Sequence, residues 1–180
     1  MRDALLAALT FDTFHRHADK VAMANIAQLV NCLQSPFLAH EDKFLATPTF
    51  DVFEMYGAHV GGESVRAVFS SPRIPYERVD ATGSIWGLEG SASIKDRTLT
   101  VTMVNPHVIE ARVVEIAVRG ASAASAEGMV LAAPEIHAHN TFESPRNVRP
   151  QPQKVDAPRD GVLVHRLPPA SVTRLTLHLA

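Results

Sequence analysis

The feature that most constrains this sequence is a series of short β-like segments that begins after Gly62. Residues 85–94 and 99–104 flank the polar stretch 95–98, a pattern that predicts a hairpin. Short strands with turn signals at this spacing are typical of an antiparallel sandwich or barrel. We therefore expect a mainly β region in which residues 73–83 and 134–160 are irregular loops. Further strands are predicted at residues 63–70, 112–118, 124–132, 161–167 and 172–179.

The first sixty residues have a different pattern. Residues 2–19 have helical spacing and end in a basic stretch, where the helix dipole favours positive charge. Residues 32–46 are expected to be a connection without regular structure, since they contain Pro36 and a charged stretch. A second helix is predicted from Thr47-Pro48 to about His59, since Thr is a good N-cap and Pro suits the first helical position. The face expected to be buried on the first helix comprises Leu5, Leu6, Leu9, Thr13 and Phe14.

Between these helices, residues 21–30 form an almost wholly apolar run, which predicts a strand buried on both faces, as in a parallel sheet. This stretch and its end carry three amides, Asn25, Gln28 and Asn31. A buried amide must find hydrogen-bond partners. Either nearby backbone groups supply them, which is the commoner case, or the amides bind a polar ligand at the end of the strand.

The composition narrows the class of protein. The chain has 180 residues, of which 46% are hydrophobic and 20% charged, as in a globular protein. A net charge of −2 gives no reason to expect nucleic acid or an anionic membrane as a partner. Cys32 is the single cysteine, so no intrachain disulfide can form, and its apolar setting predicts a buried, inert thiol.

Two other groups of residues suggest chemistry. His137 and His139, with Glu135, could ligate a metal only if they lay on a strand, but Pro134 and Asn140 indicate a loop. We therefore expect loop histidines that bond to the backbone, and predict no metal site and no cofactor. Tyr76 and Trp86 could stack on a sugar ring, but a single Trp in a β segment is more often part of the core.

Several motifs resemble glycoside hydrolase family 51, the α-L-arabinofuranosidases. They are Asn25-Ile-Ala-Gln-Leu-Val-Asn31, Val104-Asn-Pro-His107 and Ile136-His-Ala-His-Asn-Thr-Phe142. The resemblance implies an antiparallel, jelly-roll-like β-sandwich preceded by a helix-strand-helix remnant of a (β/α)8 barrel. On that template residues 1–61 are the last, incomplete elements of the catalytic barrel, and residues 62–180 are the C-terminal β-sandwich domain.

The resemblance also implies a function. These retaining hydrolases release terminal α-L-arabinofuranosyl residues from arabinan and arabinoxylan oligosaccharides. Gln28 matches the family glutamine that hydrogen-bonds the arabinofuranose. The two catalytic glutamates of the family lie on earlier barrel strands, so no catalytic residue is expected here. Surface charge is the expected role of Glu54, Glu63, Glu89, Glu110 and Glu115.

The resemblance further implies a cytoplasmic protein that forms a homo-oligomer in the intact family, with arabinofuranosyl oligosaccharides as partners and no nucleic acid or membrane. We expect the chain alone to be inactive. The alternative hypothesis is a non-catalytic β-sandwich module for assembly or carbohydrate binding. Because one strand and two helices cannot close a barrel, we also expect residues 1–60 to be loosely held or to drive association.

Overall fold

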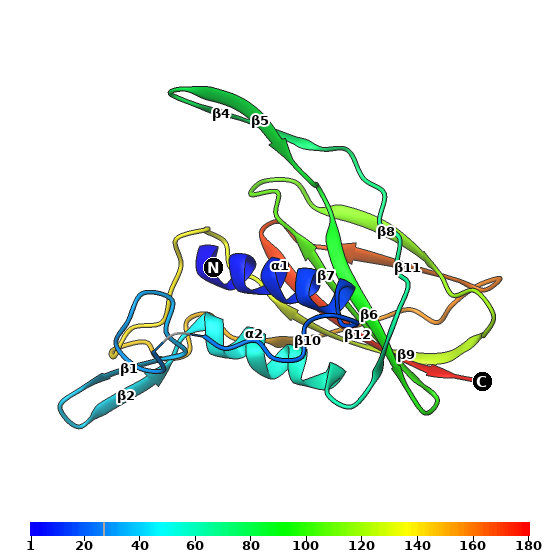
Figure 1. The fold of residues 1–180 in the computed structure, drawn as a ribbon, viewed down its shortest axis with the longest axis horizontal. Helices are drawn as coiled ribbons and strands as arrows, with labels where there is room; N and C mark the ends of the chain where they lie inside the picture. The colour runs from blue at the N-terminus through cyan, green and yellow to red at the C-terminus, as the bar shows by residue number, and fades with distance from the viewer. Residues whose placement is uncertain (27) are drawn as a thin grey trace.

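The computed structural model describes residues 1–26 and 28–180. It consists of three layers: a pair of helices, a six-stranded antiparallel sheet and a two-stranded sheet (Figure 1). The mainly β architecture predicted from the sequence is confirmed. Strand order in the large sheet is β10-β9-β12-β7-β6-β3. These strands are β3 (Glu63–Val65), β6 (Glu89–Lys95), β7 (Thr98–Asn105), β9 (Ala123–Leu131), β10 (Gln151–Gln153) and β12 (Ser171–Leu179).

One face of the large sheet is covered by β8 (Arg112–Ala117) and β11 (Val162–Leu167), which pair with each other. Alternate side chains of β7 and β12 point toward these two strands, as the period of a strand requires. The result is a sandwich core between the sheets. Its buried members include Leu99, Val101, Met103, Val114, Leu163, Leu175 and Leu177.

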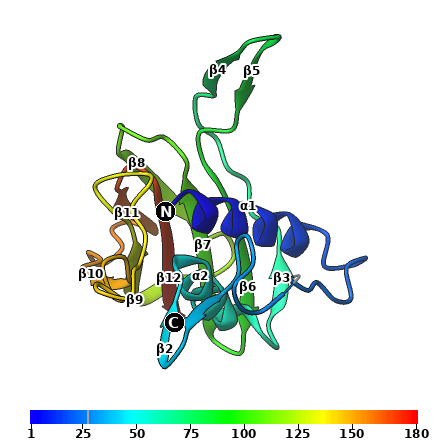
Figure 2. The ribbon, with the colours of Figure 1, turned by 90° about the vertical axis from the view of Figure 1, so that its left-hand side faces the viewer.

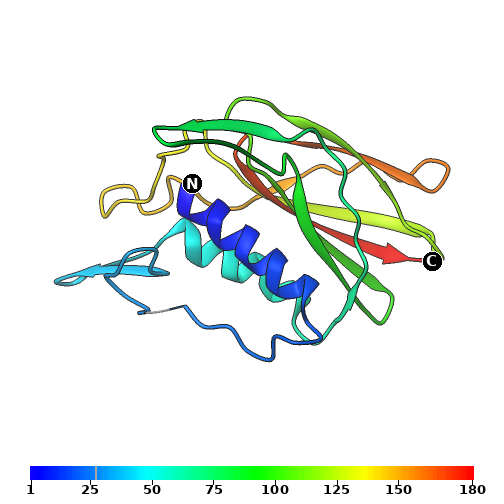
Figure 3. The same cartoon turned by 45° about the horizontal axis from the view of Figure 1, so that its top comes forward.

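The opposite face is covered by the helices α1 (Arg2–Arg16) and α2 (Pro48–Tyr56), followed by the 3-10 turn η1 (Gly57–His59). Figure 3 shows the two helices side by side along the sheet. They share a second buried core with the sheet, so the domain boundary expected after residue 61 runs through a packed interface. This core includes Ala4, Ala8, Val52, Val104, Leu131 and Val172.

The buried face of α1 differs from the one expected. Leu6 is 51% exposed and Thr13 is exposed, whereas the buried stripe comprises Ala4, Leu5, Ala8 and Asp12. The stripe follows the i, i+4 ridge of the helix, and its two alanines let the helix axis approach the sheet closely. A search for large apolar residues missed this face because its members are mostly small or polar.

The prediction of a buried strand at residues 21–30 is wrong for the part that the structure describes. Residues 21–26 and 28–30 form no strand, and Met23 (78% exposed) and Leu29 (60%) face solvent. A strand of a parallel sheet needs neighbouring strands for its main-chain groups. Among the described residues this segment pairs only through a bridge between Val30 and Phe37. Residue 27 lies outside the described residues.

Two hairpins were expected to be loops. The first pairs β1 (Phe37–His40) with β2 (Lys43–Ala46), and the second pairs β4 (Ile74–Arg78) with β5 (Ala81–Ile85). Figures 1 and 2 show that the β4–β5 hairpin extends away from the rest of the molecule as an arm. The sequence did not predict this hairpin because β4 contains Pro75, and proline argues against a strand except at an edge.

Trp86, which directly follows β5, was expected in the core, and this expectation is wrong. Trp86 is 55% exposed and Tyr76 is 43% exposed. The Arg73 guanidinium lies 4.2 Å from the centroid of the Trp86 ring and also donates to the Ser84 carbonyl (2.8 Å). Trp86 is therefore an ordered surface residue.

Candidate functional site

Gln28, the residue predicted to bind substrate, lies on the exposed segment between the two helices. Its backbone adopts φ = 56°, in the left-handed region that L-residues other than Gly, Asn and Asp seldom occupy. Such outliers cluster at ligand-binding sites, where the surrounding structure holds them. Six other described non-glycine residues also have a positive φ, so this backbone geometry permits a binding role for Gln28 but does not assign one.

The segment after Gln28 is tied to the β1–β2 hairpin by Asn31. The Asn31 side-chain amide donates to the Ala39 carbonyl, and its oxygen accepts from the Ala39 N–H, both at 2.8 Å. The backbone supports this clamp, because Phe37 N–H donates to the Leu29 carbonyl at 3.2 Å. Asn31 is thus a structural amide, as the commoner interpretation predicted.

The other end of the hairpin is anchored to the start of α2 and to the loop that precedes β10. The Thr47 hydroxyl donates to the Ser35 carbonyl (2.8 Å), and the Asn140 amide donates to the Ala46 carbonyl (2.9 Å). Thr47 occupies the N-cap position of α2, as predicted, but its hydroxyl serves the preceding loop and not the helix. The hairpin is consequently fixed on both sides.

A cleft of about 330 Å³ lies between the first turns of α1 and α2, residues 32–35 and residues 136–140. Cys32, expected to be buried, is half-buried and lines this cleft. His137 and His139 lie in a loop, as predicted, and the His139 Nδ1 is 2.9 Å from the His137 carbonyl. Within residues 1–26 and 28–180 no three His, Cys, Asp or Glu side chains gather in a group that could hold a metal ion.

The densest group of polar side chains lies elsewhere, between the helices and the sheet. Asp12 of α1 is fully buried, and its Oδ1 accepts hydrogen bonds from three hydroxyls on different elements. Tyr56 of α2 donates at 2.9 Å, Ser91 of β6 at 2.8 Å and Thr102 of β7 at 3.1 Å. The other oxygen, Oδ2, is buried and has no partner among the described residues.

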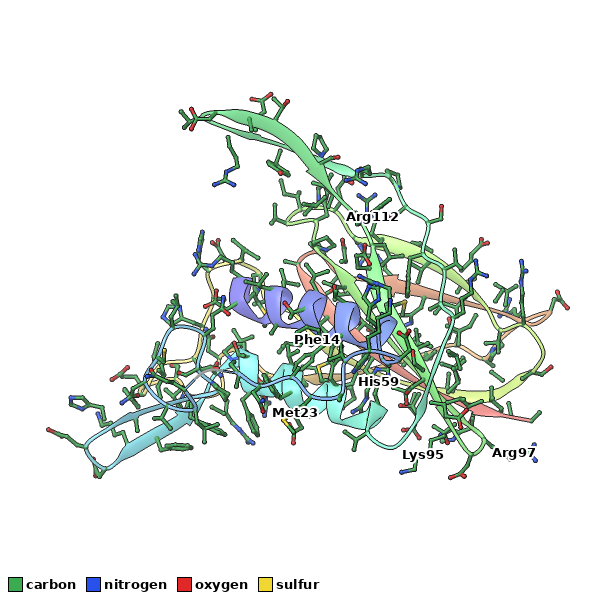
Figure 4. The ribbon with its side chains drawn as sticks, viewed as in Figure 1. Phe14, Met23, His59, Lys95, Arg97 and Arg112 are labelled. Carbon is green, nitrogen blue, oxygen red and sulfur yellow. The ribbon has the colours of Figure 1, made fainter. Side chains whose placement is uncertain are left out.

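Two histidines complete this group, which we call the Asp12 cluster. The Thr102 hydroxyl uses its single proton on Asp12, so the His59 Nε2 at 3.2 Å must donate to it. The His59 Nδ1 then accepts from the Ser93 hydroxyl at 2.7 Å. This pattern fixes His59 as neutral with its proton on Nε2. By the same reasoning the His15 Nδ1 donates to Ser91 (3.0 Å). His59 is labelled in Figure 4, where α2 ends beside the sheet.

Burial dominates the electrostatics of this cluster. It raises the pKa of the Asp12 carboxyl to about 6, although the three hydroxyl donors oppose the shift. It lowers the pKa of His59 to about 3, assisted by the neighbouring His15 and by Arg174, and it also lowers the pKa of His15. Burial and the Asp12 charge raise the pKa of Tyr56 well above its ordinary value.

Perturbed pKa values are a common mark of active sites, but Asp12 and its three hydroxyl donors are buried and cannot reach a substrate. The glutamates considered in the sequence analysis are either paired with an arginine or exposed to solvent. The Arg16 guanidinium binds Glu89 at 2.7 Å, and Arg112 lies 3.5 Å from Glu110. Glu54, Glu63 and Glu115 are exposed. These placements agree with surface charge and ion pairing.

Comparison with known proteins now identifies the family. Residues 1–171 match the domain described as the alpha-L-arabinofuranosidase C-terminal domain. The chain belongs to this family. An intracellular exo-alpha-L-arabinofuranosidase from Bacteroides ovatus is 32% identical over 177 residues, which make up 98% of this chain and 34% of the relative. The chain thus spans about a third of the length of that relative.

Solved structures agree with the family domain. The family 51 arabinofuranosidase from Xanthomonas axonopodis pv. citri superposes with a TM-score of 0.89 at 33% identity, covering 97% of this chain and 35% of that one. The arabinofuranosidase from Thermotoga maritima, solved as an arabinose complex, gives a TM-score of 0.85 at 25% identity, covering 98% and 38%. Among the residues described here, no helix is long and apolar enough to cross a membrane.

Proposed function

We propose that this chain acts as the C-terminal part of an α-L-arabinofuranosidase, a retaining hydrolase that releases terminal α-L-arabinofuranosyl groups from arabinan and arabinoxylan oligosaccharides. The observation that carries the proposal is the family match along residues 1–171. Residues 1–61 would belong to the catalytic barrel, and residues 62–180 would form the accessory sandwich. The intracellular relative supports a cytoplasmic location.

In this proposal Gln28 hydrogen-bonds the arabinofuranose, and the two catalytic carboxylates lie outside the chain. Two observations support the role of Gln28. It is exposed and held at an unusual φ, and the following residues are fixed by the Asn31 clamp. A retaining mechanism needs two carboxyl groups about 5 Å apart across the scissile bond. The buried Asp12 and the ion-paired Glu89 are unsuited to that role.

The proposal can be tested with p-nitrophenyl α-L-arabinofuranoside. The purified chain should give no turnover, whereas a chimera in which it replaces the matching third of the Bacteroides ovatus relative should be active. In the chimera Gln28→Ala should lower kcat/KM by about tenfold to a hundredfold, the cost of one lost substrate hydrogen bond. Asn25→Ala, an exposed amide of the same segment, is the matched control. Turnover by the chain alone, or an unaffected Gln28→Ala chimera, would contradict the proposal.

A second candidate function, a module for assembly or carbohydrate binding, is favoured by the exposed aromatic residues of the β4–β5 arm. Trp86 is the single tryptophan and directly follows β5, so tryptophan fluorescence, excited selectively, reports on the base of this arm. A saturable shift on adding arabinan or xylan oligosaccharides would support carbohydrate binding, and a shift with protein concentration would support assembly. A constant spectrum in both titrations argues against the module.

A further inference from the structure

The Asp12 cluster joins the two helices to the β6–β7 hairpin, which lies far from both helices in the sequence. Its hydroxyl and imidazole groups come from α1, from α2 with η1, from β6 and from β7. Every donor chain in it ends at the same atom, Asp12 Oδ1. The carboxyl group is therefore the common anchor by which both helices hold the sheet.

The two oxygens of this carboxyl group are unequal. Oδ1 accepts three hydrogen bonds, whereas Oδ2 is buried without a described partner. An ionised Asp12 consequently carries charge in a dry interior with half of its acceptor capacity unused, which is costly. A proton on Oδ2 removes that charge and leaves the three donors on Oδ1 in place.

The three hydroxyl donors and the Arg16 charge offset the charge on Asp12 only in part. The titratable and charged groups nearest Asp12 are His15 and Arg16 on α1, Tyr56 and His59 at the end of α2 and in η1, Glu89 on β6 and Arg174 on β12. Both histidines are held neutral by burial, and Arg16 is paired with Glu89. β7 contributes Thr102, which does not titrate. Burial accordingly raises the pKa of Asp12 to about 6.

We propose that the Asp12 cluster is a proton-sensitive latch, which holds α1 and α2 on the sheet more firmly when Asp12 is protonated than when it is ionised. The sign follows from linkage: a carboxyl group whose folded pKa is raised favours the folded state as the pH falls, between about 6 and its unfolded value near 4. Since α1 precedes and α2 follows the segment that carries Gln28, the latch sets how firmly both ends of that segment are held.

The test compares the chain with Asp12→Asn, whose neutral amide resembles the protonated acid in shape. Urea unfolding constants are measured for both from pH 4 to pH 7.5. The ratio of the wild-type to the variant constant should rise by about fiftyfold over this range, because two pKa units correspond to a hundredfold change in an equilibrium constant. Taking the ratio cancels the contributions of His15 and His59, and any constant cost of the amide.

Asp19→Asn, which changes an exposed carboxyl group just beyond α1, is the matched control and should give a flat ratio. In the unmodified chain, NMR follows the chemical shift of the Asp12 carboxyl carbon as the pH is changed, and gives the pH midpoint of its titration. The proposal is therefore testable even if Asp12→Asn fails to fold. A midpoint near 6 with a rising ratio supports the latch. A midpoint below about 4.5, or a ratio independent of pH, would overturn it.

Discussion

Replacing Asn31 by alanine should release the β1–β2 hairpin from the segment that carries Gln28. The substitution removes two hydrogen bonds of 2.8 Å to Ala39. At about 0.5–1.5 kcal/mol each, and less for an exposed pair, their loss costs about 1–2 kcal/mol. Alanine must also adopt the observed φ of 56°, at a further cost of about 1 kcal/mol. We expect local opening of the hairpin to become easier by about 2–3 kcal/mol in total.

The Ala39 amide reports this change directly, because it donates to the Asn31 oxygen. Hydrogen exchange at Ala39 should accelerate about thirtyfold to a hundredfold in Asn31→Ala, since about 1.4 kcal/mol corresponds to a factor of ten. Asn31→Gly loses the same hydrogen bonds without the backbone strain, so its acceleration should be about fivefold smaller.

The comparison of these two variants separates the contribution of the Asn31 hydrogen bonds from that of the left-handed backbone. Equal exchange rates in Asn31→Ala and Asn31→Gly would show that the left-handed backbone costs nothing here. Unchanged exchange at Ala39 in both would refute the clamp itself. Asn25→Ala serves as the control, and should leave Ala39 unaffected.

Four further outcomes can be measured by urea unfolding. Leu175→Ala should cost about 2–5 kcal/mol, since Leu175 is fully buried between the two sheets; a smaller loss would mean that the core can collapse into the cavity. Gly90→Ala should cost about 1–3 kcal/mol, because its Cβ would lie 2.2 Å from the Thr102 carbonyl oxygen. Gly57→Ala, with no atom within 4 Å of its Cβ, should stay within about 0.5 kcal/mol of the parent. His59, whose folded pKa is lowered to about 3, should cost the fold roughly 3 kcal/mol as the pH falls from 6.5 to 4. His59→Asn should remove that loss, and an unchanged pH dependence would contradict the neutral tautomer.

The sandwich could be predicted from the sequence because its signals are local. Turn residues precede and follow the strands of the sandwich, and the alternation of apolar residues marks the buried face of a strand. These strands are β6, β7, β8, β9, β11 and β12. The two missed hairpins lacked such signals. β4 contains Pro75, and β1–β2 is so short that it was interpreted as a connection.

The Asp12 cluster could not be predicted, because the three hydroxyl donors to Asp12 lie 44, 79 and 90 residues away from it in the sequence. Nothing in the sequence near Asp12 distinguishes it from a surface carboxylate. The choice of the leucine face on α1 made the error larger, since that face turns Asp12 outward. Only the fold, by stacking α1 and α2 on β6 and β7, brings the three hydroxyl donors to one carboxyl oxygen.

The segment at residues 21–30 presents the opposite conflict, since its apolar composition predicts burial and its described part is exposed. Leu6 on α1 and Met23 and Leu29 on the segment are large apolar side chains that face solvent. In the proposed enzyme these side chains would face the remaining strands of the barrel, and Gln28 would lie at the end of one barrel strand. Under that proposal the apolar composition of the segment reflects the environment that it would occupy in the whole enzyme. On this argument Met23 and Leu29 should lose solvent exposure in the active chimera, where methyl NMR relaxation by a soluble paramagnetic probe can detect the change.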